Sequence, residues 1–308
     1  MIARFLALFV GICLTATTAA QTPPQQLFDD VRILAADDME GRLAGTPGSA
    51  KARAYLLERL RAIGVEPAYA ALEQPFETVY KDKPLKGVNL IGRIPGTGKS
   101  DRVLVIGAHY DHFGVQDGKI FNGADDNASG VAVLLSIAEA FVRERPEHDV
   151  IFALWDAEEQ GLFGAKAFVA APPVPLSRIV MNLNLDMMSR SDKNELWLAG
   201  AHHYPFLRPR FERLAKAAPV SLKLGHDGPP WKGIDDWTDG SDHHVFHAKG
   251  IPFAYFGVED YPDYHQPGDD FAAIPKDFFA RSAATALLAA RLFDTELDAI
   301  AQESKRAK

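Results

Sequence analysis

Three mainly apolar stretches, each followed by a polar residue, constrain the fold of this chain more than any other feature. The stretches are 102–108, 149–155 and 179–185, and they lead into His109, Asp156 and Asp186. An apolar run without polar alternation indicates a strand buried on both faces of a sheet. Because the carboxyl ends of parallel strands lie at one edge of an open α/β sheet, the residues that follow these strands are expected to converge there.

The rest of the chain predicts helices and further strands around these three. Pro47 near the start and Gly64 just past the end bound one helix. The other predicted helices are 27–36, 131–142, 162–169, 205–217 and 276–297. The other predicted strands are 88–94, 195–199 and 252–257. The sequence shows no internal repeat or interdomain linker, so residues 21–308 are predicted to form a single domain.

The N-terminal residues have the pattern of an export signal. Arg4 is followed by an apolar core over 5–14 and by small residues up to Ala20. We therefore expect residues 1–20 to be a signal peptide cleaved near Ala20, which places the mature protein in the periplasm or outside the cell. The core is shorter than the roughly 20 apolar residues that a membrane span needs. The only cysteine, Cys13, lies in this segment, so a metal in the mature chain would be bound by histidines and carboxylates.

Charge argues against a nucleic-acid partner. The 308 residues carry a net charge of −8, and the sequence contains no basic run. Residues 93–100 end like a phosphate-binding loop, but Arg93 stands where the first glycine belongs and a strand follows instead of a helix. Nucleotide binding at this loop is therefore rejected.

Several short motifs carry candidate metal ligands, and each also has a purely structural interpretation. His109 and Asp111 could be a ligand with an orienting carboxylate, or His109 could be an ordinary core histidine. Asp125 and Asp126, between small residues, could bind metal or cap the next helix. The pair Glu158 and Glu159 can divide its work between a metal and a water only if the backbone turns there.

Two other features are harder to assign. His243 and His247 have the i, i+4 spacing of a helical zinc site, but His244 replaces the glutamate that such a site requires, so the zincin interpretation is rejected. The long loop 225–240 contains Trp231 and Trp237. These rings could line a pocket for an apolar side chain, or they could seal the loop onto the core.

Taken together, the motifs resemble the secreted two-zinc aminopeptidases, a family that also contains glutamate carboxypeptidase and the glutaminyl cyclases. The resemblance rests on His109-Tyr110-Asp111, the segment 123–130, Glu158-Glu159-Gln160-Gly161, Asp186 and Tyr264-His265, together with the early segment 41–49. It implies a three-layer α/β/α architecture with a central, mostly parallel mixed sheet, the phosphorylase/hydrolase-like fold of zinc exopeptidases. It also implies a cis peptide bond between Asp126 and Asn127.

The same resemblance implies roles for individual residues. One zinc would be bound by His109, Asp126 and Asp186, and a second by Asp126, Glu159 and His265. Asp111 would orient His109, and Glu158 would be the general base. Because a histidine binds metal only when neutral, this ligand set implies metal loss below about pH 6.

The expected function is that of a metallo-aminopeptidase with two Zn²⁺ per chain. It would hydrolyse the N-terminal bond of peptides that have a free N-terminus, using a metal-bridging hydroxide and Glu158 as general base. The alternatives are a glutaminyl-cyclase-like enzyme, which works with one zinc, and a deacylating amidohydrolase on the same fold. A third hypothesis, a non-catalytic peptide-binding protein, is disfavoured by the presence of Glu158.

Overall fold

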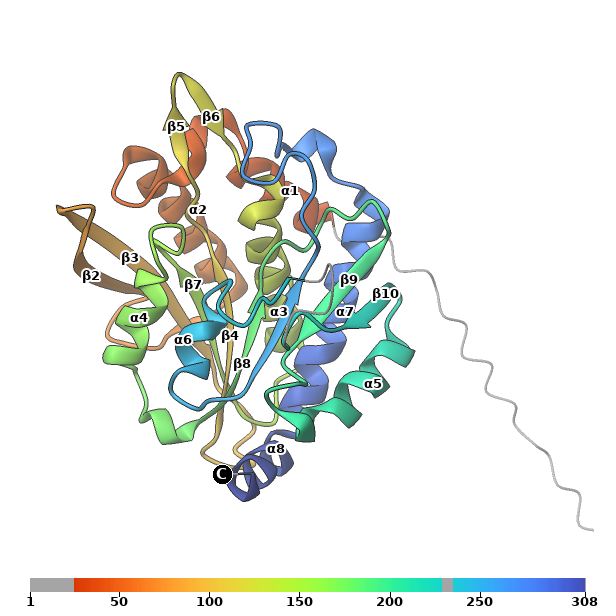
Figure 1. The fold of residues 1–308 in the computed structure, drawn as a ribbon. Helices are drawn as coiled ribbons and strands as arrows, with labels where there is room; N and C mark the ends of the chain where they lie inside the picture. The colour runs from red at the N-terminus through yellow and green to blue at the C-terminus, as the bar shows by residue number, and fades with distance from the viewer. Residues whose placement is uncertain (1–24, 229–234, 308) are drawn as a thin grey trace, which may run out of the picture.

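A mixed β-sheet runs through the centre of the molecule, and helices cover both of its faces (Figure 1). The structure is a computed structural model that describes residues 25–228 and 235–307. The expected signal peptide and Trp231 lie outside the described residues. The three-layer α/β/α architecture expected from the resemblance is confirmed.

The sheet has the order β1-β3-β7-β4-β8-β11-β9-β10, with β2 paired to β3. Its strands are β1 (Glu66–Pro67), β2 (Glu73–Tyr80), β3 (Lys83–Ile94), β4 (Val103–His109), β7 (Asp149–Trp155), β8 (Ile179–Leu185), β9 (Glu195–Ala199), β10 (Ser221–Leu224) and β11 (Phe253–Gly257). The central strands β7, β4, β8 and β11 are parallel, whereas β3 and β9 run antiparallel to their neighbours in the centre.

Helices form the two outer layers. They are α1 (Gln25–Leu34), α2 (Pro47–Ile63), α3 (Gly130–Arg143), α4 (Phe163–Ala170), α5 (Arg208–Ala217), α6 (His243–His247), α7 (Lys276–Thr295) and α8 (Leu297–Arg306). α3 packs against α1, α2 and α7 on one face, while α4 and α6 contact each other on the other face. The expected caps of α2 are present, with Thr46 accepting a bond from the Ser49 amide and Gly64 in the left-handed conformation.

Strand β4 shows why a continuous apolar run belongs in the middle of such a sheet. Leu104 and Ile106 face the core beneath α3 and α7, while Val103 and Val105 face the second core beneath α4 and α6. Alternate residues of a strand point to opposite faces, so both faces must be apolar when both are covered. All seven residues of β4 are buried.

The strand register brings the polar residues to one edge. His109 pairs with Trp155 at the ends of β4 and β7. Gly107 pairs with Asn184 across β4 and β8, so His109 and Asp186 both lie two residues beyond that pair. The convergence predicted from the apolar stretches is therefore confirmed.

Some elements differ from the predictions. The β2–β3 hairpin, the separate hairpin of β5 (Gly114–Gln116) and β6 (Lys119–Phe121), and strand β10 were not predicted. Both hairpins project from the body of the protein (Figure 1). The predicted final helix is two helices, because the backbone leaves the helical conformation at Glu296. Its carboxylate is held there by Arg210 and Arg213.

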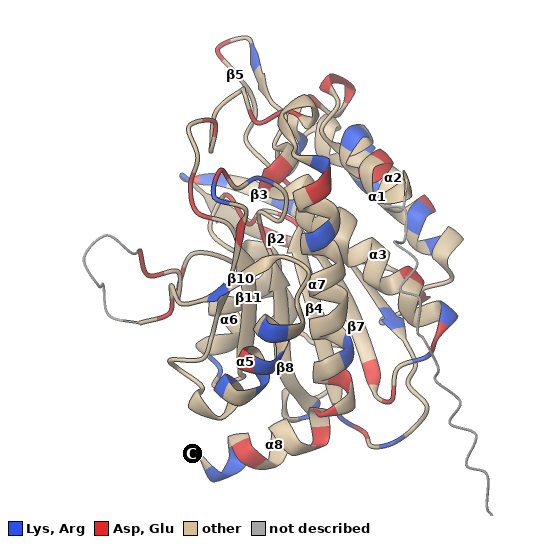
Figure 2. Ribbon diagram, turned by 90° about the vertical axis from the view of Figure 1, so that its right-hand side faces the viewer, with Lys and Arg blue, Asp and Glu red and all other residues tan. Residues whose placement is uncertain are grey.

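The outer helices carry charges of both signs. Figure 2 shows basic and acidic residues interspersed along α1, α2, α7 and α8. Such mixing is typical of helix faces that contact solvent. No helix within the described ranges combines the length and apolarity needed to cross a membrane.

Candidate metal centre

Three predicted ligands from separate elements meet at the carboxyl edge of the sheet. His109 ends β4, Asp186 follows β8, and Asp126 lies in the turn before α3. The Nε2 atom of His109 lies 3.2 Å from Asp126 Oδ1 and 3.3 Å from Asp186 Oδ1. All three residues are buried.

These donors fit a zinc ion. With zinc–ligand bonds of roughly 2.0–2.1 Å, neighbouring ligand atoms of a tetrahedral site are about 3.3 Å apart. The two distances from His109 Nε2 match that separation. The carboxylates Asp186 and Glu158 also raise the pKa of His109 well above its usual value, although burial alone would lower it. The site therefore carries an excess of negative charge that a divalent cation would offset.

The second oxygen of Asp126 faces another histidine. His265 Nε2 lies 3.1 Å from Asp126 Oδ2, on the opposite carboxylate oxygen from the one that His109 approaches. The His265 ring sits between Phe113, at 4.6 Å, and Tyr264, at 3.7 Å between ring centroids. The Asp126 carboxylate thus lies between two histidines, with one ring near each of its oxygens.

The turn that carries Asp126 is fixed from several sides. The Asp126-Asn127 peptide bond is cis, so that prediction is confirmed. Both oxygens of Asp269 accept hydrogen bonds from the backbone, with Asp126 N 3.0 Å from Oδ2 and Asp125 N 3.0 Å from Oδ1. The Asp125 carboxylate accepts bonds from the backbone and the hydroxyl of Ser189. Asp125 therefore supports the turn, while Asp126 faces the site.

Glu158 and Glu159 follow β7 at a point where the backbone turns. Such a turn is required if one glutamate is to face a metal and the other a water. Ala157, just before them, has a φ of 58°. The Asp111 carboxylate accepts hydrogen bonds from the backbone N–H groups of Glu158, at 3.0 Å, and Glu159, at 3.3 Å. The same carboxylate lies 3.8 Å from His109 Nδ1, whose closer partner is the Asp111 backbone oxygen at 3.2 Å. The Asp111 carboxylate therefore holds the backbone of both glutamates, while the hydrogen bond to His109 comes from the Asp111 backbone oxygen.

The environment of Glu158 suits a general base. Burial raises its pKa well above the usual 4.5, and the nearby carboxylates of Asp242 and Asp186 add to that rise. A carboxylate whose pKa is raised is a stronger base, so it accepts a proton from water more readily than an exposed glutamate does.

His112 is a site residue that the sequence did not single out. Its Nδ1 lies 2.6 Å from Glu159 Oε1 and 3.8 Å from Asp126 Oδ2. Burial lowers the pKa of His112 to about 3, so the ring is neutral and its Nδ1–H can donate to Glu159. His112, Asp126 and Glu159 form a compact group, whereas His265 belongs to none of the three such groups found among the described residues.

Arg42 is the second residue that sequence reasoning missed. It lies in the early segment that contributed to the resemblance, and its side chain is fully buried. Its guanidinium donates to four backbone carbonyls, those of Leu34, Tyr110, Asn122 and Gly123. Arg42 therefore ties together the segments that present His109 and Asp126.

The sequence offers little indication of Arg42 and Asp269, because each forms hydrogen bonds with backbone groups that are far away in the sequence. Arg42 and Tyr110 are 68 residues apart, and Asp269 and Asp126 are 143 residues apart. No spacing rule connects such pairs. The position of His112 next to Asp111 was the one local hint.

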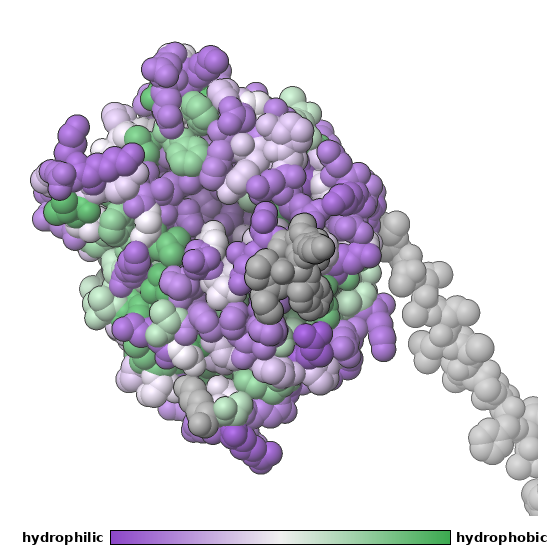
Figure 3. Space-filling model, viewed as in Figure 1, coloured by the Kyte–Doolittle hydropathy of each residue, from purple (hydrophilic) through white to green (hydrophobic). Residues whose placement is uncertain are grey.

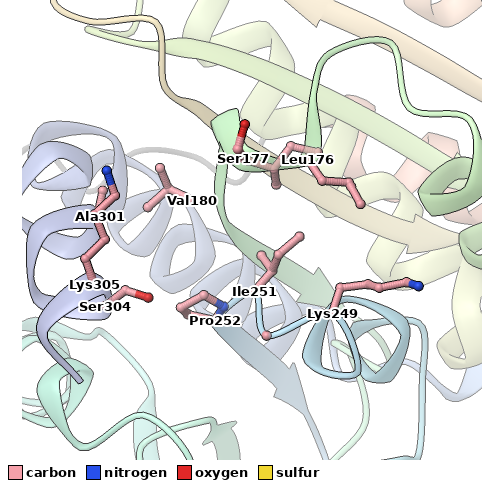
Figure 4. Close-up of a pocket in the computed structure, with 11 residues that line it drawn as sticks. Leu176, Ser177, Val180, Lys249, Ile251, Pro252, Ala301, Ser304 and Lys305 are labelled. Carbon is pink, nitrogen blue, oxygen red and sulfur yellow. The ribbon is translucent and has the colours of Figure 1, made fainter. Parts of the chain in front are cut away.

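The surroundings of the metal centre are polar, and a separate pocket lies elsewhere. The surface between the β5–β6 hairpin and α6 is hollowed and hydrophilic (Figure 3). A cavity of about 210 Å³ lies instead near the amino ends of β8 and β11 (Figure 4). It is lined by residues such as Val180, Pro252 and Ser304. The metal ligands follow the opposite ends of these strands, so this cavity is not the metal centre.

Histidines and carboxylates that converge at the carboxyl edge of an α/β sheet define a metal-binding enzyme site. Comparison with known proteins makes the class more specific. The sequence profile of Peptidase family M28 matches residues 89–290. The chain belongs to this family, and the family implies zinc at the site.

Individual relatives span several activities. The chain is 30% identical over 263 residues to an Arabidopsis thaliana protein described as "Probable glutamate carboxypeptidase LAMP1", matching 76% of this chain but only 36% of that protein. A zinc aminopeptidase from Bacillus subtilis, BSAP, has a similar fold, with a TM-score of 0.69, 17% identity and coverage of 86% of this chain and 94% of that one. A glutaminyl cyclase from Bacteroides thetaiotaomicron also has a TM-score of 0.69, with 21% identity and coverage of 85% and 95%.

Proposed function

We propose that this chain is a zinc-dependent aminopeptidase that removes the N-terminal residue from peptides. One observation carries the proposal: the two carboxylate oxygens of Asp126 face different histidines, His109 at 3.2 Å and His265 at 3.1 Å. A carboxylate placed in this way can bridge two metal ions.

In this proposal one zinc is held by His109, Asp126 and Asp186, and the other by Asp126, Glu159 and His265. Zinc supplies Lewis-acid activation of water and of the scissile carbonyl. Asp111 holds the turn that presents Glu158 and Glu159, through its two backbone hydrogen bonds.

Glu158 carries the proton during hydrolysis. It accepts a proton from the attacking water and delivers that proton to the amine of the leaving peptide. Burial and the neighbouring carboxylates raise the pKa of Glu158, which favours its taking up the proton released by the water. The free α-amine of a substrate carries positive charge and is attracted to the carboxylates of the site.

A glutaminyl-cyclase-like reaction is the second candidate. It is favoured by the position of His112, which occupies the immediate surroundings of Glu159 at 2.6 Å. In that arrangement the site would hold one ion.

Metal analysis and product analysis on the same sample separate the two candidates. We expect two zinc ions per chain by elemental mass spectrometry, loss of activity with a chelator and recovery with zinc. Mass spectrometry of a peptide beginning with glutamine should show release of free glutamine. Loss of ammonia without chain shortening, together with one zinc per chain, would instead establish the cyclase reaction.

A peptide with an acetylated N-terminus is the matched control for the substrate. It should not be cleaved, because the free amine is required. Cleavage of free and acetylated peptides at similar rates would rule out an aminopeptidase.

We also propose that the protein is exported, on the basis of residues 1–20. Cell fractionation and N-terminal sequencing of the mature protein should find it outside the cytoplasm and beginning near Gln21. A cytoplasmic protein that retains Arg4 would refute export.

A further inference from the structure

A small acidic cavity adjoins the metal centre. It has a volume of about 200 Å³, room for one long side chain, and is lined by His226, Asp235, Trp237, Glu259 and Asp260. Gly257 connects it to the metal ligands. A Cβ added at Gly257 would lie 3.1 Å from the backbone oxygen of Asp186 and 3.3 Å from the Trp237 ring.

His226 forms the buried wall of this cavity. Its ring stacks on Trp237 with centroids 3.7 Å apart and an angle of 11° between the planes. Its Nδ1 lies 2.8 Å from the Asp235 backbone oxygen. Burial lowers the pKa of His226, so the ring is neutral, and Nδ1–H donates to that oxygen. Nε2 is therefore left as a hydrogen-bond acceptor.

That acceptor has no hydrogen-bond partner among residues 25–228 and 235–307. The His226 side chain is 3% exposed, and Nε2 lies 3.8 Å from Glu259 Oε1. A buried polar atom without a partner is costly unless a ligand or water supplies the missing bond. Here the missing group is a donor.

The charges of the cavity also require a donor. Asp235 and Asp260 have no ion pair within the described part of the chain, and Glu259 pairs with Lys193 through Oε2 alone. Partial burial of its carboxyl group raises the pKa of Asp260, and the negative charges of Asp235 and Asp126 raise it further. Carboxylates that repel one another in this way favour an added cation.

A lysine or arginine side chain meets both requirements, because it carries positive charge and has only hydrogen-bond donors. An aliphatic side chain would leave the acceptors unsatisfied, and an acidic one would be repelled. The sequence alone did not decide whether Trp237 lines a pocket for an apolar side chain or seals its loop onto the core. Trp237 packs against the core residues Phe253 and Tyr255, which supports the seal, and it also lines this cavity, whose other side chains are polar and mostly acidic.

We propose that this acidic cavity binds the side chain of the N-terminal residue of the substrate and that the enzyme prefers lysine or arginine there. The inference rests on the aminopeptidase activity proposed above.

The test compares fluorogenic amides of lysine, arginine, norleucine and leucine with the zinc-loaded full chain. Norleucine matches the length of lysine up to the ammonium group, so the ratio of the two kcat/KM values isolates the charge. We expect lysine to exceed norleucine at least about tenfold, since a polar site discriminates against an analogue that lacks its partner group. Added salt should reduce this ratio.

Replacing both acids, in the double variant Asp235→Asn and Asp260→Asn, should bring the ratio close to one by lowering the lysine value. Both side chains are exposed and both changes keep the side-chain shape, and a thermal melt would confirm folding. The matched control is Asp82→Asn at the exposed tip of the β2–β3 hairpin, which should leave the ratio unchanged.

Each outcome has one meaning. Cleavage of norleucine or leucine as fast as lysine, or an unchanged ratio in the double variant, would overturn the cavity assignment while leaving the aminopeptidase function in place. No cleavage of any amide would overturn the proposed function itself.

Discussion

Replacing Arg42 by lysine is expected to lower the free energy of unfolding by about 4 kcal/mol, although the charge is kept. The guanidinium of Arg42 donates to the carbonyls of Leu34, Tyr110, Asn122 and Gly123 at 2.5–2.9 Å. A lysine ammonium concentrates its donors on one nitrogen and cannot span these four oxygens. Two or three bonds are lost at roughly 1.5 kcal/mol or more each, because the donor is charged and the carbonyls remain buried.

Urea unfolding, followed by tryptophan fluorescence with zinc in equal excess for all variants, measures this loss. The matched control is Arg145→Lys. Arg145 is exposed and also donates to backbone carbonyls, those of Pro95 and Gly96. Water can replace these bonds, so the control should lose no more than about 0.5 kcal/mol.

The two variants together decide whether burial is the cause. If Arg42→Lys costs less than about 1 kcal/mol with an unchanged denaturant slope, the four buried bonds do not stabilise the segments that carry the ligands. If Arg145→Lys costs as much as Arg42→Lys, the number of bonds and not their burial determines the effect.

Three further predictions concern the site and its surroundings. Glu158→Gln should lower kcat by about 10²–10⁴-fold with unchanged zinc content, and a rate within tenfold of the parent would exclude Glu158 as the base. His112→Phe should weaken binding of the zinc held by Glu159 by about 10–100-fold in chelator competition, while the other ion stays bound; equal affinity for both ions in variant and parent would contradict the hydrogen bond's role. Burial lowers the pKa of His243 to about 3, so the unfolded chain binds a proton between pH 6.5 and 3 that the folded protein does not, and stability falls as the pH is lowered through this range. His243→Gln should therefore reduce the loss of unfolding free energy between pH 6.5 and 4.5 by up to about 2 kcal/mol, and identical pH slopes for variant and parent would show that His243 is not the group responsible.

The sequence was informative where a residue follows a buried strand. His109 comes directly after a continuous apolar run and Asp186 after a mainly apolar strand, and the parallel register places the ends of these strands together. The fold class and the convergence of ligands therefore follow from the period of the hydrophobic pattern and from the way parallel strands are connected. The assignment of Asp126 as the shared ligand came from the resemblance, since its local sequence alone favoured a helix cap.

The sequence was less informative where neither face of an element is fully covered. Strand β2 alternates between partly and fully exposed residues, so it lacks the apolar signal of a buried strand. The β5–β6 hairpin has an Asp117-Gly118 turn, a known hairpin signal, but its strands have only three residues each. Arg42 and Asp269 escaped because they bind backbone groups, which carry no sequence signature.

The two projecting hairpins are places where related proteins can gain residues without changing the carboxyl edge of the sheet that carries the candidate ligands. Their tips, Lys81-Asp82 and Asp117-Gly118, are exposed and take no part in the contacts described among the ligands. Doubling the length of a surface loop costs only about 0.6 kcal/mol in closure entropy. The turn at Asp126, by contrast, is fixed by Asp269 and by Arg42 through Gly123, so an inserted residue there would displace a ligand. A lineage can therefore add whole modules at the hairpin tips while the metal-binding turns keep their length.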